Sequence, residues 1–216
     1  TNIHFSSGGD SLKVIVVTSA CPGEGKSLTA ANLAITFAQA GENVVLLDAD
    51  MRRSTQHGNF ELPESPGLSE AVVSGNIEAS LNNGPVDGLR LMTAGLTPPN
   101  PSELLHSRRM DNLLDDLRAR SDLIIMDAPP VLAVADASVL ASKADGVIVA
   151  VDLTLSDRNA AKRAIGALRA VNARILGTVI TGLEPTRKRY GYHHYYDRYY
   201  YYYDSEHGPD GKDRAH

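Results

Sequence analysis

The stretch that most constrains this chain is residues 14–29, with the sequence VIVVTSACPGEGKSLT. A short β-branched run is broken by proline and glycine, and residues that favour helices follow at once. This order predicts a buried strand, a loop that surrounds an anion with its main-chain N–H groups, and a helix. The predicted helix, residues 27–39, would direct the positive end of its dipole at the same point. The stretch therefore predicts a phosphate-binding site between a strand and a helix.

The loop matches the pattern G-x-x-x-x-G-K-[ST] at every fixed position except the first, where Ala20 replaces glycine. Lys26 would bring a positive charge to the β- and γ-phosphates of a nucleotide, and Ser27 would offer a hydroxyl ligand to Mg²⁺. The alternative, a glycine-rich turn that binds nothing, is disfavoured by the strand and helix on either side. The predicted nucleotide contacts are Pro22, Gly23, Glu24, Gly25, Lys26, Ser27 and Leu28.

Apolar runs typical of strands alternate with segments that carry apolar residues at helical spacing. The predicted strands are residues 14–17, 44–47, 89–92, 123–126, 147–151 and 175–180. The predicted helices are residues 28–40, 67–73, 102–119, 136–142 and 157–171. Continuous rather than alternating apolar strands indicate burial on both faces. The pattern predicts an α/β fold with a largely parallel central sheet and helices on both faces.

Acidic residues follow two of the predicted strands. Asp48 and Asp50 come at the end of one, and Asp127 ends another. Ligands of parallel sheets bind beyond the carboxyl ends of the strands, so these carboxylates are candidates for holding Mg²⁺ or accepting a proton. For any single aspartate, a helix cap or a turn is the common alternative. The coincidence of all three with a phosphate loop favours the functional interpretation.

Composition excludes several other classes of protein. The formal net charge is −5 and the isoelectric point is near 5.8, which gives no support for a nucleic-acid surface. The single cysteine, Cys21, excludes an intrachain disulfide framework and fits a reducing compartment. No apolar run approaches the roughly 18 residues that a membrane-spanning helix needs. We expect the region in hand to have been cut from a longer protein, because it begins at Thr1 without an initiator methionine.

The C-terminal segment, residues 184–216, differs sharply from the rest. It holds all nine tyrosines: Tyr190, Tyr192, Tyr195, Tyr196, Tyr199, Tyr200, Tyr201, Tyr202 and Tyr203. Proline, glycine, histidine and aspartate interrupt any helical or strand period, so we predict a flexible, largely disordered tail that follows a folded domain of residues 1–183. Such a tail can enter an active site as a phosphoryl acceptor. A low-complexity segment that only self-associates is the alternative.

Three motifs together resemble those of a known family. PGEGKS at 22–27, LLDADMR at 46–52 and IIMDAPP at 124–130 are similar to the Walker A, A′ and B motifs of the bacterial tyrosine kinases, the autokinases that govern capsule and exopolysaccharide export. Residues 67–75 and 98–107 also resemble this family. The resemblance implies a P-loop NTPase fold, ATP and Mg²⁺ as cofactors, and autophosphorylation of the tyrosine cluster.

The resemblance also implies roles for particular residues. Mg²⁺ would bind Ser27 within reach of Asp48 or Asp127, and most of the catalysis would come from positioning and charge neutralisation. Asp50 is the candidate base for the tyrosine hydroxyl, although Asp48 and Asp50 could exchange roles. Arg52 would steady the γ-phosphate or an acidic tail, or it is a solvated surface arginine.

Further expectations follow for partners and location. Family members transfer phosphate in trans within a ring of subunits, through a helix that would precede Thr1, and a membrane activator segment switches them on. A cognate tyrosine phosphatase would reverse the reaction. The chain would be cytoplasmic, at the inner face of the plasma membrane. Each phosphate adds negative charge, so we expect a heavily phosphorylated tail to leave its neighbour's site.

Two departures and two alternatives qualify this interpretation. Partition and positioning ATPases of similar fold carry a signature lysine where this chain has Cys21, which disfavours an ATPase that moves cargo without a protein substrate. Family members often have asparagine near the end of the last strand, where Thr181 and Gly182 occur here, so the adenine contact is not predicted. A non-catalytic adaptor with a nucleotide switch is the second alternative.

Overall fold

A computed structural model describes residues 12–183 of the chain. Residues 1–11 and 184–216 lie outside the described residues. The predicted tail, its nine tyrosines and the domain boundary at residue 184 therefore stay predictions.

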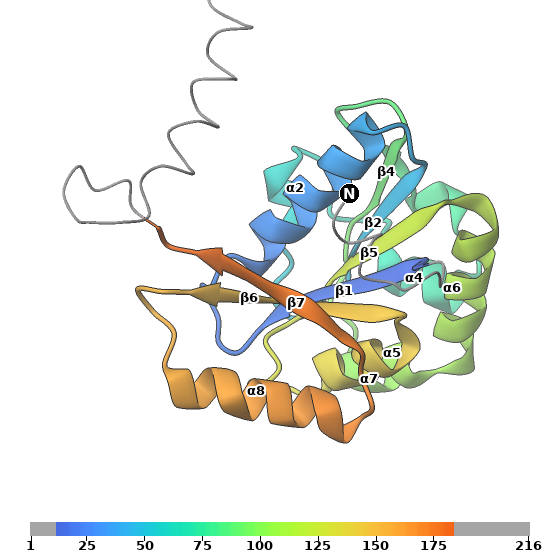
Figure 1. Ribbon diagram of the computed structural model, residues 1–216. Coiled ribbons are helices and arrows are strands. Elements are labelled where there is room, and N and C mark those ends of the chain that lie inside the picture. Colours follow the sequence, from blue (N-terminus) through green and yellow to red (C-terminus); the bar gives the residue numbers. More distant parts are fainter. Residues whose placement is uncertain (1–11, 184–216) are drawn as a thin grey trace, which may run out of the picture. The chain divides into compact units, whose positions relative to one another are not determined.

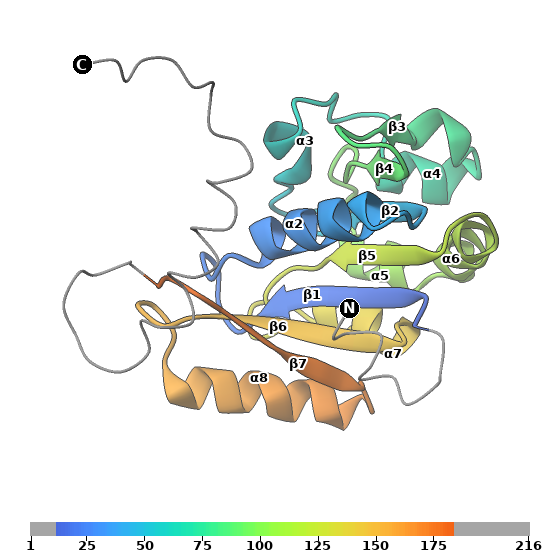
Figure 2. The ribbon, with the colours of Figure 1, turned by 45° about the horizontal axis from the view of Figure 1, so that its top comes forward.

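Seven strands form one sheet in the order β3-β4-β2-β5-β1-β6-β7, which Figure 2 shows from β4 to β7. The strands are β1 (Val14–Ser19), β2 (Val44–Asp48), β3 (Asn82–Asn83), β4 (Leu89–Met92), β5 (Leu123–Asp127), β6 (Gly146–Asp152) and β7 (Ile175–Thr181). Every pairing is parallel except that of β3 with β4. The prediction of a largely parallel α/β sheet is confirmed, and all six predicted strands are present. The short antiparallel strand β3 was missed, because two polar residues leave no apolar run.

The helices are α2 (Lys26–Gln39), α3 (Gln56–Asn59), α4 (Leu68–Ser74), α5 (Pro101–His106), α6 (Arg108–Arg120), α7 (Asp136–Lys143) and α8 (Arg158–Ala170), with a 3₁₀ turn η1 (Glu78–Ser80) (Figure 1). The prediction of one helix over 102–119 is wrong, because Ser107 interrupts it and separates α5 from α6. This residue has an extended backbone, and its hydroxyl accepts a hydrogen bond from the N–H of Met110, so that it caps α6. Both α3 and η1 are too short to leave a periodic signal.

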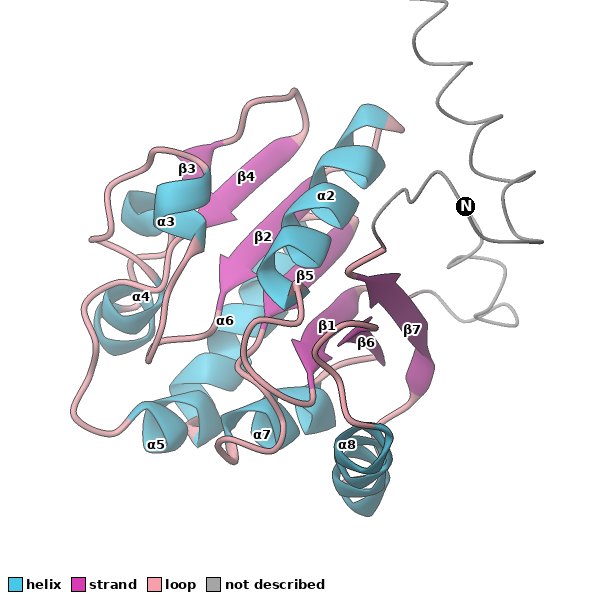
Figure 3. Ribbon diagram, turned by 90° about the vertical axis from the view of Figure 1, so that its left-hand side faces the viewer, coloured by secondary structure: helices cyan, strands magenta, loops and turns pink. Residues whose placement is uncertain are grey.

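The central strands are buried on both faces, as their continuous apolar sequences predict. Helix α2 covers one face with Ala30, Ala34 and Phe37, which pack against Ile15 and Leu46. Helices α4 to α8 contribute to the core on the other face. Figure 3 shows α2 on one side of the strands and α5, α7 and α8 on the other. No helix within residues 12–183 is both long and apolar enough to cross a membrane.

Glu70 of α4 joins two loops close to the carboxyl edge of the sheet. Its carboxylate accepts hydrogen bonds from the N–H groups of Gly67 (2.8 Å) and Leu96 (3.0 Å) and from the hydroxyls of Ser65 and Ser69. Burial alone would raise the pKa of Glu70, but the main-chain donors of Leu96 and Gly67 lower it to about 2. The loop that follows β4 is therefore held in place at the edge where the phosphate loop lies.

Candidate active site

The candidate site lies at the carboxyl ends of the three central strands β2, β5 and β1. The phosphate loop follows β1, while Asp48 ends β2 and Asp127 ends β5. Asp48 and Asp127 are directly paired in the register of β2 with β5. Parallel strands end at the same edge, so side chains that are far apart in sequence meet there. The structure brings together Lys26, Asp48, Asp50 and Asp127.

Lys26 begins α2 and lies between two carboxylates. Its Nζ is 3.0 Å from Oδ2 of Asp50 and 3.5 Å from Oδ1 of Asp127, and it donates a hydrogen bond to the hydroxyl of Ser27. Burial lowers the pKa of Lys26, but the charges of Asp127 and Asp50 raise it by more, so the net pKa lies above the ordinary value. The ammonium group is therefore charged at neutral pH, directly beneath the loop.

Asp127 is fully buried and has one oxygen without a hydrogen-bond donor. Oδ2 accepts a hydrogen bond from Nε2 of Gln56 at 2.8 Å, and the nearby hydroxyl of Ser27 acts to lower the pKa of the carboxyl group. Oδ1 has no hydrogen-bond partner among the described residues, although Lys26 lies 3.5 Å away. Burial raises the pKa of Asp127 in spite of these partners. A buried carboxylate oxygen beside a serine hydroxyl fits the preference of Mg²⁺ for hard oxygen ligands.

Asp48 is also fully buried, but main-chain groups occupy it. Its oxygens accept hydrogen bonds from the N–H groups of Asp50 (3.2 Å), Thr55 (3.0 Å) and Gln56 (3.0 Å). The last two donors lie at the start of α3, so Asp48 caps this helix from across the turn. Burial and the charge of Asp127 nevertheless raise the pKa of Asp48 to about 7. Asp48 therefore fixes the turn that carries Asp50. Its negative charge and that of Asp127 repel each other.

Gln56 is a site residue that the sequence analysis missed. It is buried, and its Nε2 donates to the carboxylate of Asp127 and, at 3.0 Å, to the main-chain oxygen of Ser27. Its Oε1 accepts a hydrogen bond from Asn59 at 3.2 Å. One amide thus ties α3 to β5 and to the first turn of α2. A glutamine eight residues after a strand carries no motif, so no local signal indicated it.

Two glycines with positive φ and the hydrogen bonds of Glu24 determine the conformation of the phosphate loop. Gly23 and Gly25 have φ values of 85° and 80°, which residues with a Cβ rarely adopt. Glu24 was predicted to contact nucleotide, but its side chain is buried, accepts a hydrogen bond from the N–H of Cys21 at 2.7 Å, and accepts a further one from the hydroxyl of Ser156. The carboxylate therefore holds the loop from inside. Pro22 and Gly23 are exposed, as is Leu28 on α2.

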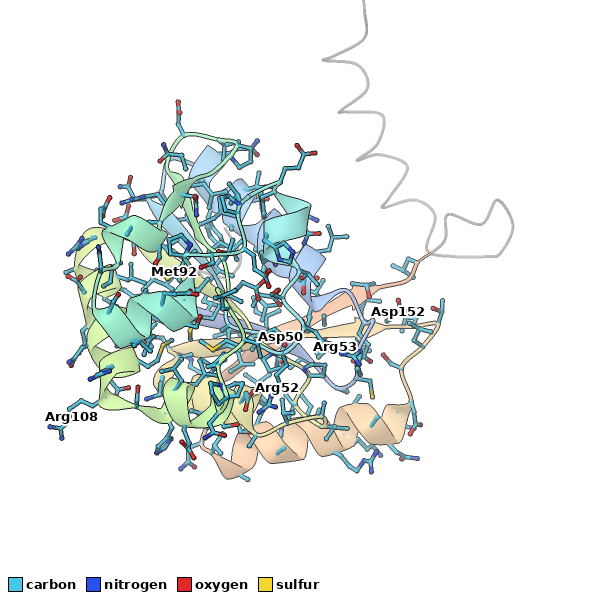
Figure 4. All side chains as sticks on the ribbon, turned by 180° about the vertical axis from the view of Figure 1, so that it is seen from behind. Asp50, Arg52, Arg53, Met92, Arg108 and Asp152 are labelled. Carbon is cyan, nitrogen blue, oxygen red and sulfur yellow. The ribbon has the colours of Figure 1, made fainter. Side chains whose placement is uncertain are left out.

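Arg52 lies on the same edge but does not join the cluster around Lys26. Its Nε donates to the buried carboxylate of Asp136 at 2.8 Å, and its Nη2 donates to Ser102 at 3.2 Å. About 40% of the Arg52 side chain remains exposed. Figure 4 shows Asp50, Arg52 and Arg53 close together at this edge. Arg52 therefore anchors the turn after β2 to α5 and α7, which the sequence did not indicate.

Comparison with known proteins gives concordant results. Residues 12–175 match a family model described as an AAA domain. The chain is 40% identical over 195 residues to the tyrosine-protein kinase YwqD of Bacillus subtilis, a match that covers 89% of this chain and 82% of that protein. It is 38% identical over 193 residues to the putative tyrosine-protein kinase EpsB of Ralstonia nicotianae, but covers only 26% of that longer protein. Among solved structures, the chimerical protein CapA2B2 has a TM-score of 0.81 and 37% identity, with 84% of this chain and 80% of that chain covered.

Proposed function

Because the chain belongs to the family of bacterial tyrosine kinases, we propose that it transfers the γ-phosphoryl group of ATP to tyrosine hydroxyls. The acceptors are the nine tyrosines of residues 190–203, presented by another copy of the chain, and the reaction regulates capsule or exopolysaccharide synthesis and export. The observation that carries the proposal is the buried cluster of Lys26, Asp50 and Asp127 directly beneath the phosphate loop.

The loop and the start of α2 supply the nucleotide contacts. Main-chain N–H groups between Pro22 and Ser27 and the ammonium of Lys26 would hold the phosphates, aided by the helix dipole. Glu24 contributes by keeping the loop in its curled form. Pro22 of the loop and Leu28 of α2 are exposed, so a nucleotide can approach from this side.

The residues that would hold Mg²⁺ are Ser27 and Asp127, with Asp48 within reach through water. Support comes from the Oδ1 atom of Asp127, which is buried without a hydrogen-bond donor, and from the neighbouring serine hydroxyl. When bound, the ion would neutralise charge on the phosphoryl oxygens. Asp48 keeps its main-chain bonds in this arrangement and acts chiefly by positioning the turn.

Asp50 is the proposed base for the attacking tyrosine. Its carboxylate is held by Lys26 on one oxygen and by the N–H of Arg53, at 3.0 Å, on the other. As the new bond between the tyrosine oxygen and the γ-phosphorus forms, the phenolic proton passes to Asp50. The bond from the γ-phosphorus to the bridging oxygen breaks, and ADP leaves with the electron pair. The charge on Lys26 and the fixed loop dipoles stabilise the transition state.

A membrane activator and a location at the inner face of the plasma membrane belong to the same proposal. EpsB is much longer than this chain, so in that relative the matching region is one part of a larger protein. The CapA2B2 structure is a chimera of two components by its name, which supports a partner segment that acts on the kinase region. A ring of copies and a cognate tyrosine phosphatase complete the proposed system.

The deciding experiment is intact and peptide mass spectrometry after incubation with Mg-ATP and the activator segment. Phosphate should appear on several tail tyrosines of the unaltered chain and be absent from Lys26→Met alone. It should return to Lys26→Met when active chain is mixed in, because transfer is in trans. ATP consumption without phosphotyrosine in any mixture would instead indicate a positioning-type ATPase.

A further inference from the structure

Helix α8 presents basic side chains to solvent without partners. Arg158, Lys162, Arg163 and Arg169 are all exposed. None of the four forms an ion pair with another described residue, whereas arginines elsewhere in the fold, such as Arg90 and Arg120, do pair with carboxylates. Figure 1 shows α8 lying along β6 and β7, with no described helix or strand outside it. Within residues 12–183, no ion pair offsets the charge of these four side chains.

Three of these residues form a straight stripe along the helix. At about 100° per residue, positions 158, 162 and 169 fall within roughly 40° of one another around the axis. The stripe is about 16 Å long at a rise of about 1.5 Å per residue. Arg163 flanks it, and the buried residues Ala160, Ala164 and Leu168 are on the side that packs against the sheet. We call Arg158, Lys162 and Arg169 the basic stripe.

The sequence segment that holds the basic stripe is basic, although the whole chain carries a net charge of −5. Between Leu153 and Leu183 there are five basic residues and one acidic residue, Asp157. Asp157 caps α8, because its carboxylate accepts hydrogen bonds from the N–H groups of Asn159 and Ala160. Its charge is thus directed into the helix rather than along its outer side. The patch is suited to an anionic partner.

The last described residues of the chain follow β7, which ends next to the loop that leads to α8. The N–H of Leu153, in the loop that leads to α8, donates to the main-chain oxygen of Thr181 at 3.2 Å, two residues before Leu183. Tyr199 is 16 residues beyond Leu183 (199 − 183), so it can reach up to about 55 Å at roughly 3.5 Å per residue. The whole of α8 is only about 20 Å long.

We propose that the basic stripe of α8 is a docking surface for the phosphotyrosines of this chain's own tail. This inference rests on the proposed function, since it requires the tail to be phosphorylated. Each phosphate carries about −1.5 to −2 charges and three acceptor oxygens, which arginine and lysine bind through charge-assisted hydrogen bonds. The partner is the same chain, because its tail is covalently attached after Leu183, within reach of α8, and is therefore present at a high effective concentration.

Spacing supports the match between the two segments. If the peptide binds in an extended conformation, Tyr199, Tyr201 and Tyr203 share one side of it, at intervals of about 6.8 Å and over a span of about 14 Å. The basic stripe offers three cations over about 16 Å. Three phosphates can therefore face three basic groups without folding of the peptide.

Docking on α8 gives the phosphates a function after transfer. The product tail is removed from the carboxyl edge where Lys26 and Asp50 lie, which leaves the site open to the next acceptor. The unphosphorylated tail, with few carboxylates near its tyrosines, gains little from the stripe. Phosphorylation thus transfers the tail from the active site, where it accepts phosphate, to the surface of α8.

The test uses the whole chain with Lys26→Met, so that its own tail stays unphosphorylated. Two fluorescent synthetic peptides of residues 190–206 are titrated by anisotropy, one with phosphotyrosine at 199, 201 and 203 and one without. The phosphopeptide should bind at least about tenfold more tightly. Adding Lys162→Glu with Arg169→Glu should weaken its binding at least about tenfold, and added salt should do the same.

The matched control is Arg108→Glu with Arg109→Glu, two exposed residues of α6 that change the net charge by the same amount. It should alter binding by less than about twofold. Equal losses in both double variants would overturn the proposal, because they would reflect net charge alone. So would retention of phosphopeptide binding by the α8 variant together with loss of binding to phosphatidylglycerol vesicles, which would assign the stripe to lipid. Because the phosphopeptide is synthetic, docking is decided even if the chain phosphorylates nothing.

Discussion

Replacing Gln56 by methionine should destabilise the fold through the polar contacts that one buried amide makes. Methionine keeps the length and nearly the volume of glutamine, so packing changes little. The variant lacks Nε2, so the carboxylate of Asp127 and the main-chain oxygen of Ser27 each lose the hydrogen bond that Gln56 donates. A hydrogen bond to a charged group contributes about 1.5–3 kcal/mol and a neutral one about 1 kcal/mol, so we expect a loss of about 2–4 kcal/mol.

Urea unfolding followed by circular dichroism measures this loss as a lower midpoint at an unchanged slope. In a domain of this size the same loss lowers Tm by about 4–15 °C. Gln39→Met is the matched control, because Gln39 is exposed at the end of α2 and should change the free energy of unfolding by less than about 0.5 kcal/mol.

A second replacement, Gln56→Glu, tests the cause. It brings another carboxyl group close to Asp127, where burial and like charge raise the pKa of both groups. A carboxyl whose folded pKa is raised stabilises the fold at low pH, and this stability is lost as pH rises through the folded pKa. Gln56→Glu should therefore be much less stable at pH 8 than at pH 5, whereas Gln56→Met should show no such difference relative to wild type. A stable Gln56→Met variant, or a pH-independent Gln56→Glu variant, would refute the reasoning.

Three further changes give separate tests. Glu70→Gln should lower the free energy of unfolding by about 1–2 kcal/mol at pH 7, which is less than the full pKa shift implies because the carboxylate is partly exposed. Urea titrations should show the difference in free energy of unfolding from wild type shrinking as pH falls from about 4.5 toward the folded pKa of about 2. Arg52→Ala should leave the buried Asp136 without its cation and cost about 2–3 kcal/mol, and Arg52→Ala with Asp136→Ala should cost less than the sum of the two single changes. Asp127→Asn should abolish Mg²⁺-dependent phosphorylation, measured by mass spectrometry, while Tm stays equal or rises, because the repulsion of Asp48 is relieved.

The parts of the site that could be predicted are those that follow from strand order. Asp48 and Asp127 end the strands β2 and β5, which pair in parallel, so their meeting at one edge required no knowledge of side-chain conformation. Lys26 could be placed beside these carboxylates because it is a fixed position of the phosphate-loop motif, which follows the neighbouring strand β1. These positions depend on main-chain direction, which apolar runs reveal well.

The parts that could not be predicted depend on side chains that reach across the fold. Gln56 is placed by a four-residue helix with no periodic signal, and its partners lie 29 and 71 residues away in sequence. Glu24 belongs to the motif, yet its side chain turns inward because the hydroxyl of Ser156, from a loop 132 residues further on, meets it there. Arg52 pairs with Asp136 in the same way. Contacts of this kind have no local pattern, so only the folded chain reveals them.

The candidate site holds more buried carboxylates than its single lysine can neutralise. With Asp48, Asp50 and Asp127 ionised and Lys26 protonated, the cluster carries −3 + 1 = −2. Burial makes this imbalance costly, and the pKa of about 7 at Asp48 is the result, because a proton there removes part of the charge. A divalent cation would instead cancel the full −2 of the ionised cluster, so that no proton on Asp48 would be needed. The structure thus tolerates a destabilising excess of carboxylates at the one edge where Mg²⁺ and phosphates would meet, which is why Asp127→Asn should spare the fold and still remove activity.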